Sequence, residues 1–307
     1  MSKINIFSII INQIAVMFLL MILGYFIYKK RLIDEIGTKQ ISNLLIRVIA
    51  PIIMITTFQI EFSIEKLRQL FLAFIFSLIS MIIGFIIAKI IFKKEQKLEQ
   101  FATTFSNAGF IGIPLVQAIL GSDSIFYLSA YLVSFNLLNW TYGIYLLTGK
   151  KESISIKQAL VNPATIGSAV GIILFVLSIR LPEIVLSTLN HVGSINTPLA
   201  MIVLGVYVAQ SELKSLFNDY RIYFSSFISL VVIPIIMIFA LLLIPEKYNE
   251  IKTVILIATA APVGVSLAIF AEQYGSDYEY GSRIISLSTF MSLLTIPAIL
   301  YLSNIIW

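Results

Sequence analysis

Two clusters of helix-breaking residues interrupt stretches of this sequence that are otherwise almost wholly apolar. The clusters consist of an asparagine, glycines and prolines, namely Asn107, Gly109, Gly112 and Pro114 in the first and Pro262 and Gly264 in the second. Summed propensities disfavour a continuous helix over the first cluster by about 5 kcal/mol relative to alanine, so we expect the helix to open there. An unwound backbone leaves N–H and C=O groups without partners, and these groups can bind an ion.

The polarity of the freed helix ends favours an anion. The N-terminal end of a helix carries roughly half a positive charge, which is worth about 0.3 to 2 kcal/mol toward a negative ligand. Two interrupted helices that cross would turn such ends toward one cavity, and this favours a carboxylate. Asn107 could bind that ligand or could only cap its helix. The alternative for the prolines is that they merely kink packed helices.

Other polar residues within apolar stretches are candidates for the same cavity. They are Arg47, Asn136, Asn139 and Ser266, with Asn196 and Gln59 as weaker candidates. Asn136 and Asn139 are three residues apart and share one helix face, so they either line the cavity or bond a neighbouring helix. Arg47 is either a counter-charge for an anion or a side chain that extends to the membrane interface.

The remaining polar residues of the apolar stretches have simpler interpretations. Thr103, Thr104 and Ser106 are expected to bond the backbone of their own helix. His191 is the single histidine, and we expect it near a helix end and not in a proton relay.

Missing residue types exclude most other chemistry. The chain has no cysteine and one histidine, and its 16 acidic residues all fall in predicted loops or near the ends of predicted spans. This composition supports neither a metal site, a carboxylate proton relay nor a catalytic pair. We therefore expect no enzyme activity, no cofactor and no bound metal. The formal net charge of +5 does not indicate nucleic acid binding, because in a chain with many membrane spans the positions of the cations carry the information.

The elements that position these residues are predicted to be membrane-spanning helices. With 59% hydrophobic and 12% charged residues among 307, the chain has too little polar surface for a soluble globule. Because a span needs roughly 20 mainly apolar residues, ten can be placed. They cover about 5–28, 38–60, 69–92, 100–120, 124–148, 162–180, 185–209, 220–244, 251–271 and 282–305.

Repeated landmarks indicate an internal duplication. Three pairs recur in the same order: Pro51 with Pro198 (198 − 51 = 147), Pro114 with Pro262 (262 − 114 = 148), and 121–123 with 275–277 (275 − 121 = 154). We expect a first repeat over 1–149, a short cytoplasmic linker over 150–161 and a second repeat over 162–307. Since each repeat holds five spans, an odd number, the second is inverted. The fourth and ninth spans then cross near the membrane midplane.

The distribution of cations predicts the orientation in the membrane. If the N-terminus is extracytoplasmic, fifteen of the 21 Lys and Arg residues, including Lys151 and Lys214, lie at inner loops and helix ends. The positive-inside rule therefore places both termini on the extracytoplasmic side of the cytoplasmic membrane. Ten spans satisfy this arrangement.

Several motifs resemble the auxin efflux carrier family. The stretch 107–114, followed by Gly121, resembles the fourth-helix motif of that family. Other stretches that fit its pattern are Asn162-Pro163 with Gly171, Pro198-Leu199-Ala200 through Gly205, Ala271-Glu272-Gln273-Tyr274-Gly275, and Ser288-Thr289 with Ser292 and Pro297. The resemblance extends over nearly the whole chain.

The resemblance implies a ten-helix fold with a crossover of two broken helices, elevator-type transport and organic anions as substrates. It also implies that the binding site of the family is formed here by Asn107, Pro114 and Pro262, together with Arg47 and Asn139. Plant auxin carriers have a long hydrophilic loop in mid-chain. The short loop here departs from that pattern, and microbial members are linked to small carboxylates such as malate and malonate.

The expected function is secondary transport of a small organic anion across the cytoplasmic membrane. The expected partners are a small carboxylate and the lipid bilayer, with a homodimer as one assembly that the sequence allows. Two alternatives stay open. One is a sodium-coupled carrier of the bile acid symporter type, which sodium dependence of uptake would separate. The other is a membrane receptor or scaffold that binds its ligand without moving it.

Overall fold

The computed structural model describes residues 3–150, 152, 154, 156–210 and 219–307, and these residues form helices with no strand. Lys151 and Lys214, two of the cations predicted for the inner side, lie outside this part of the chain, as do positions 153 and 155 of the predicted linker. In chain order the helices are α1 (Lys3–Lys29), α2 (Glu35–Leu44), α3 (Ala50–Thr57), α4 (Ile64–Ile91), α5 (Lys97–Thr104), α6 (Ile113–Leu120), α7 (Ile125–Leu138), α8 (Ile144–Thr148), α9 (Ile156–Leu160), α10 (Pro163–Val176), α11 (Glu183–Ser194), α12 (Asn196–Gln210), α13 (Tyr220–Phe227), α14 (Ile233–Leu241), α15 (Asn249–Ala260), α16 (Ser266–Gln273) and α17 (Tyr278–Ile306).

Six helical segments in the described part of the chain are long and apolar enough to cross a membrane. They are Ser8–Lys29, Glu35–Thr57, Ile64–Ile91, Glu183–Gln210, Tyr220–Leu241 and Tyr278–Ile306. Two shorter apolar helices cover Ala108–Leu120 and Pro163–Val176. The expected all-helical membrane class agrees with these segments. The other predicted spans consist of shorter pieces, of which the pairs α5 with α6 and α15 with α16 are the most relevant to function.

Widened π-helical turns lie directly before three prolines of the apolar helices. The turns Leu45–Ile49, Ala108–Gly112 and Ile228–Val232 each end two residues before a proline, at Pro51, Pro114 and Pro234. A proline has no N–H and its ring clashes with the carbonyl four residues earlier. A wider turn separates those groups, so the helix continues past the proline.

The expected position of the first interruption was wrong, because the π-helical turn before Pro114 keeps the helix intact there. The segment from Gly109 through Pro114 was expected to open, but it is helical throughout. The helix is instead interrupted one turn earlier, where Phe105 is extended and α5 has ended at Thr104. The glycines and the proline are absorbed by the π-helical turn, and the unwound residues lie before it.

The second interruption lies between α15 and α16, and it pairs with the first. The Asn107 amide donates to the Pro262 carbonyl at 2.6 Å, and the Gly264 amide donates to the Phe105 carbonyl at 2.9 Å. Ser106 and Val263 form an isolated antiparallel bridge between these two bonds. Backbone groups that each interrupted helix leaves without intrahelical partners are thereby satisfied by the other. We call this pairing of residues 105–107 with 261–265 the crossover.

Two helix pairs pack closely through glycines. Gly24 of α1 packs on the backbone of Ile202 in α12, and Gly171 of α10 packs on Phe58 and Met54 at α3. Any side chain at either glycine would collide with the facing helix, since an added Cβ has no room there. The two glycines are 171 − 24 = 147 residues apart, the spacing that also separates Pro51 from Pro198.

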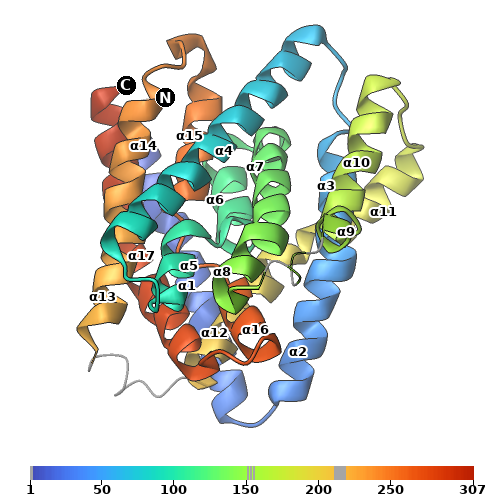
Figure 1. The fold of residues 1–307 in the computed structure, drawn as a ribbon. Coiled ribbons are helices and arrows are strands. Elements are labelled where there is room, and N and C mark those ends of the chain that lie inside the picture. Colours follow the sequence, from blue (N-terminus) through green and yellow to red (C-terminus); the bar gives the residue numbers. More distant parts are fainter. Residues whose placement is uncertain (1–2, 151, 153, 155, 211–218) are drawn as a thin grey trace.

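The buried core has two main parts. The larger apolar cluster joins α1, α3, α4, α6, α7, α12 and α15, and the smaller joins α5, α8, α16 and the start of α17. Figure 1 shows α3, α10 and α11 on one flank of the bundle and α13, α14 and α17 on the other. The chain ends marked N and C lie at the same end of the bundle (Figure 1).

Candidate functional site

A large cavity lies against the crossover. Its volume is about 900 Å³, which is near the upper end for small-molecule sites. One wall comes from α2, α3 and the residues between them, together with α9 and the start of α10. The rest of the lining comes mainly from the crossover, α7 and α16. Apolar side chains such as Met54, Phe110 and Phe135 complete the lining.

Seven of the ten predicted site residues line this cavity. They are Arg47, Asn107, Gly109, Asn136, Asn139, Gly264 and Ser266. The other three, Gly112, Pro114 and Pro262, are buried without lining it. Gly112 faces Ala108 and Leu128, while Pro262 contributes its carbonyl to the crossover. These three residues shape the backbone and do not present a surface to a ligand.

Asn107 is held at the point where the interrupted helix resumes. It is the N-cap of the helical run that starts at Ala108, and its Oδ1 accepts a hydrogen bond from the Phe110 amide at 3.4 Å. Its side chain is 4% exposed, and its Nδ2 has no hydrogen-bond partner. A buried amide donor without a partner costs about 1 to 3 kcal/mol. Both roles considered for Asn107 are therefore compatible, because the oxygen caps the helix and the nitrogen is left to bind a ligand.

The resumed helices begin at the cavity. The run Ala108–Leu120 starts beside Asn107 and Gly109, and α16 starts beside Gly264 and Ser266, all of which line the cavity. N-terminal helix ends carry partial positive charge and free N–H groups. Two such ends therefore act on the same volume and favour an anion.

Asn139 joins two elements of the site, the end of α7 and the start of α16. Its Oδ1 accepts a hydrogen bond from the Ser266 hydroxyl at 3.3 Å, and its side chain is 3% exposed. It lies at the start of a π-helical turn, Asn139–Gly143. Asn139 thus both lines the cavity and bonds a neighbouring helix, while Asn136 lines the cavity from one turn earlier.

The charges that line the cavity are all positive. Arg47 and Lys157 contribute to its wall, and no aspartate or glutamate does so among the described residues. Arg47 is exposed, so its guanidinium is available to a ligand that enters from water. The charge of the lining agrees with the anion preference of the helix ends.

Sequence reasoning missed several lining residues. Lys157, Asn43 and Asn162 were not among the predicted site residues, yet all three line the cavity. Asn196, a weaker candidate, also lines it, is 4% exposed and has an unpartnered Nδ2. An asparagine in an apolar stretch was the available signal for Asn196, whereas Lys157 reaches the cavity only through the packing of α9.

The polar residues that were not expected to bind a ligand agree only in part with their predicted hydrogen bonds. Thr104 bonds the Gln100 carbonyl of its own helix at 2.9 Å, as expected. Ser106 instead donates to the Ala258 carbonyl at 2.7 Å, and the Thr103 hydroxyl has no partner, so the expectation was wrong for both. His191 is exposed in α11 with its Nδ1 at 2.8 Å from the Ser187 carbonyl. Gln59 accepts from the Leu181 amide at 2.8 Å and does not line the cavity.

Metal-binding clusters are not found in the part of the chain that the structure describes. No group of three or more His, Cys, Asp or Glu side chains comes together there. The polar chemistry of the site consists of amides, hydroxyls, backbone N–H groups and two cations. Such a set can bind and orient an anion, and it contains no nucleophile paired with a base.

Comparison with known proteins gives three matches. The profile of a family described as "Membrane transport protein" matches residues 9–300. An uncharacterized transporter of Methanocaldococcus jannaschii is 26% identical over 299 residues, which cover 93% of this chain and 96% of the relative. A protein of Rhizobium meliloti that carries the name "Putative malonate transporter" is 23% identical over 219 residues, which cover 68% of this chain and 67% of the relative.

Proposed function

The chain belongs to the membrane transport protein family, that of the auxin efflux carriers, and on this premise we propose that it moves a small organic anion across the cytoplasmic membrane as a secondary transporter. The observation that carries the proposal is the buried, unpartnered Nδ2 of Asn107 at the crossover. Asn107 lines a cavity whose charged lining residues are all positive. Membership of a transporter family also implies that the protein is not an enzyme.

The substrate class is a small carboxylate. Arg47 and Lys157 supply full positive charge, two helix starts supply partial charge, and the amides supply neutral donors. Carboxylates suit such a set because each oxygen accepts more than one hydrogen bond. The name of the Rhizobium meliloti relative refers to malonate, so malonate and the related dicarboxylate malate are the first compounds to test.

The architecture that we propose is two inverted five-span repeats, over 1–149 and 162–307, joined by the linker 150–161. Its support is the exchanged packing of the two halves. The first span (α1) packs on the seventh (α12), and the sixth (α10) packs on the second (α3), through glycines that are 147 residues apart. The same close glycine contact thus occurs once in each half, and in both cases the facing helix belongs to the other half. An inverted repeat whose halves exchange helices in this way produces such an arrangement.

Movement is proposed to be of the elevator type. The cavity lies at the border between the group α1 to α3 with α10 to α12 and the group that contains the crossover. Sliding of the crossover group along the first group would carry a bound anion across the membrane. The inverted repeat offers two equivalent end positions for this motion. The cation distribution supports an orientation with both termini extracytoplasmic.

A carboxylate should stabilise the purified protein. At 100 times its Kd, a ligand that binds only the folded state adds about 2.7 kcal/mol to the free energy of unfolding. A thermal-unfolding screen with mono- and dicarboxylates, malonate and malate among them, measures this directly. An equal concentration of chloride is the control for ionic strength. No stabilisation by any carboxylate would contradict the proposed substrate class.

Flux separates a transporter from a receptor. The stabilising carboxylate, radiolabelled inside proteoliposomes, should exchange with unlabelled carboxylate outside. A receptor or scaffold would show the thermal shift without exchange. This outcome would keep the site and overturn the transport function.

A further inference from the structure

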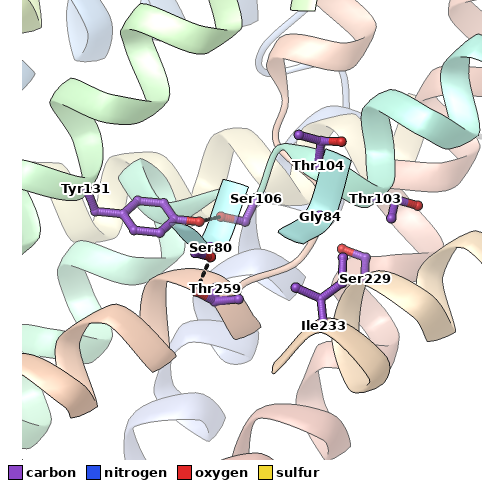
Figure 2. Close-up of a pocket in the computed structure, with 9 residues that line it drawn as sticks. All are labelled: Ser80, Gly84, Thr103, Thr104, Ser106, Tyr131, Ser229, Ile233 and Thr259. Atoms are coloured by element: carbon purple, nitrogen blue, oxygen red, sulfur yellow. Dashed lines mark hydrogen bonds between the residues drawn. The ribbon is translucent and has the colours of Figure 1, made fainter. Parts of the chain in front are cut away.

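A second, much smaller cavity lies on the other side of the crossover. Its volume is about 10 Å³, which is room for about one water molecule. Among its lining residues, Ser106 alone also lines the large cavity. Figure 2 shows its side chains, with Ser80, Ser106, Tyr131 and Thr259 close together. The crossover therefore separates two cavities of very different size.

The small cavity is lined almost wholly by hydroxyl groups. Apart from Gly84 and Ile233, every lining residue is a serine, a threonine or a tyrosine. No charged group and no side-chain amide contributes to the wall. The hydroxyls come from four elements besides the crossover itself: α4, α5, α7 and α15, with Ser229 added by the π-helical turn before α14.

Five of the seven hydroxyl protons are already used in hydrogen bonds within the protein. Thr104 donates to the Gln100 carbonyl, Thr259 to the Ile255 carbonyl at 2.8 Å, and Ser106 to the Ala258 carbonyl. Because a hydroxyl has one proton, Ser80 must then donate to Thr259 in their 2.8 Å contact. Tyr131 must likewise donate to Ser106 in their 3.0 Å contact. Each oxygen keeps lone pairs, so the wall is rich in acceptors and poor in donors.

The helix ends at this cavity have the opposite polarity to those at the large one. Thr103 and Thr104 belong to the last turn of α5, and Thr259 belongs to the last turn of α15. C-terminal helix ends carry partial negative charge and carbonyls that favour a cation. The interrupted helices thus turn positive ends to one cavity and negative ends to the other.

An unpartnered hydroxyl marks the site. Thr103 is 3% exposed and its Oγ1 has no hydrogen-bond partner. The Thr103 carbonyl also lies close to Gly84, where an added Cβ would be 3.3 Å from it. A buried oxygen without a partner is expected to have one in the functioning protein.

We propose that the small cavity binds one monovalent cation of the size of sodium. Hydroxyl and carbonyl oxygens at broken helices are ligands for such ions in transporters. The room for a single water-sized particle favours a small, dehydrated ion. The inference rests on the proposed transport function, because a cation bound behind the crossover would hold it in the form that presents Asn107 to the anion.

Sodium binding can be measured without any organic anion. The unfolding temperature of the purified full-length protein is recorded while N-methyl-D-glucamine chloride is replaced stepwise by sodium chloride at constant ionic strength. We expect a saturable rise with sodium. In Thr103→Val, the half-saturating sodium concentration should increase at least tenfold, while Thr103→Ser, which keeps the hydroxyl, should respond like the wild type.

Two further variants keep the test decisive. Ser229→Ala removes another lining hydroxyl and replaces Thr103→Val should that variant fail to fold. Ser225→Ala is the matched control, because Ser225 is equally buried nearby, bonds the Ile222 carbonyl and lines neither cavity. Identical unfolding temperatures in sodium and N-methyl-D-glucamine would overturn the inference, as would an unchanged sodium response in both lining variants.

The carboxylate screen is run in both salts so that the two proposals can fail separately. Stabilisation by a carboxylate without any sodium response would refute the cation site and leave the anion transporter standing. A sodium response without stabilisation by any carboxylate in either salt would refute the proposed substrate class.

Discussion

Replacing Asn107 by aspartate is expected to weaken carboxylate binding by about 100-fold or more, because a hydrogen bond to a charged group is worth about 1.5 to 3 kcal/mol and each 1.4 kcal/mol is a factor of ten. The substitution is nearly isosteric. It keeps the oxygen that accepts from the Phe110 amide, so the helix cap is retained. It replaces the unpartnered Nδ2 by a second oxygen, which adds repulsion of the anion. The measurement is Kd from titration of the purified variant.

The fold of this variant is checked independently. Its unfolding temperature without ligand is measured beside that of the wild type, because Asn107 is 4% exposed and a buried carboxylate lowers stability unless the start of the helical run compensates its charge. Asn190→Asp is the matched control, because Asn190 is exposed on α11 and lines neither cavity. Wild-type affinity in Asn107→Asp would show that this donor does not contact the substrate.

Reversing the charge of Arg47 is the second change with a large expected effect. Arg47→Glu should weaken anion binding by about 2 kcal/mol, or roughly 30-fold, and Arg47→Gln by less, because charge reversal both removes an attraction and adds a repulsion. The effect should decrease as salt is raised, since the exposed side chain is screened. Kd measured at low and at high ionic strength tests both statements.

A cation outside the cavity serves as the comparison. Lys30→Glu causes the same change in net charge from an exposed position that lines neither cavity. It should change Kd little. Equal losses in Arg47→Glu and Lys30→Glu would mean that Arg47 acts only through the overall charge of the protein and does not contact the anion.

The positions of the helix interruptions could be predicted to within about one turn from the sequence, and Pro114 shows why not more closely. Propensity identified a stretch that resists a regular helix. It could not identify the π-helical turn Ala108–Gly112, which moves the distortion away from the proline. The second interruption was placed correctly between Ala261 and Gly264, where no such turn intervenes.

Candidate residues were predictable where a single side chain is costly in lipid. Asn107, Asn139 and Arg47 stand out for that reason, and all three line the large cavity. Residues that are unremarkable in isolation were not predictable. Lys157 reaches the cavity through packing of α9, and the hydroxyls of Ser80 and Thr259 meet although they are 179 residues apart.

The central claim is that the paired interruptions form the anion site. Its most direct test is a structure of the protein in a lipid environment, determined with the carboxylate that gives the largest thermal shift. We predict the carboxylate of the ligand within hydrogen-bonding distance of Asn107 Nδ2, about 2.7 to 3.2 Å, and on the same side of the crossover as Arg47. A ligand bound away from the crossover, or continuous helices through residues 105–107 and 261–265, would contradict the claim.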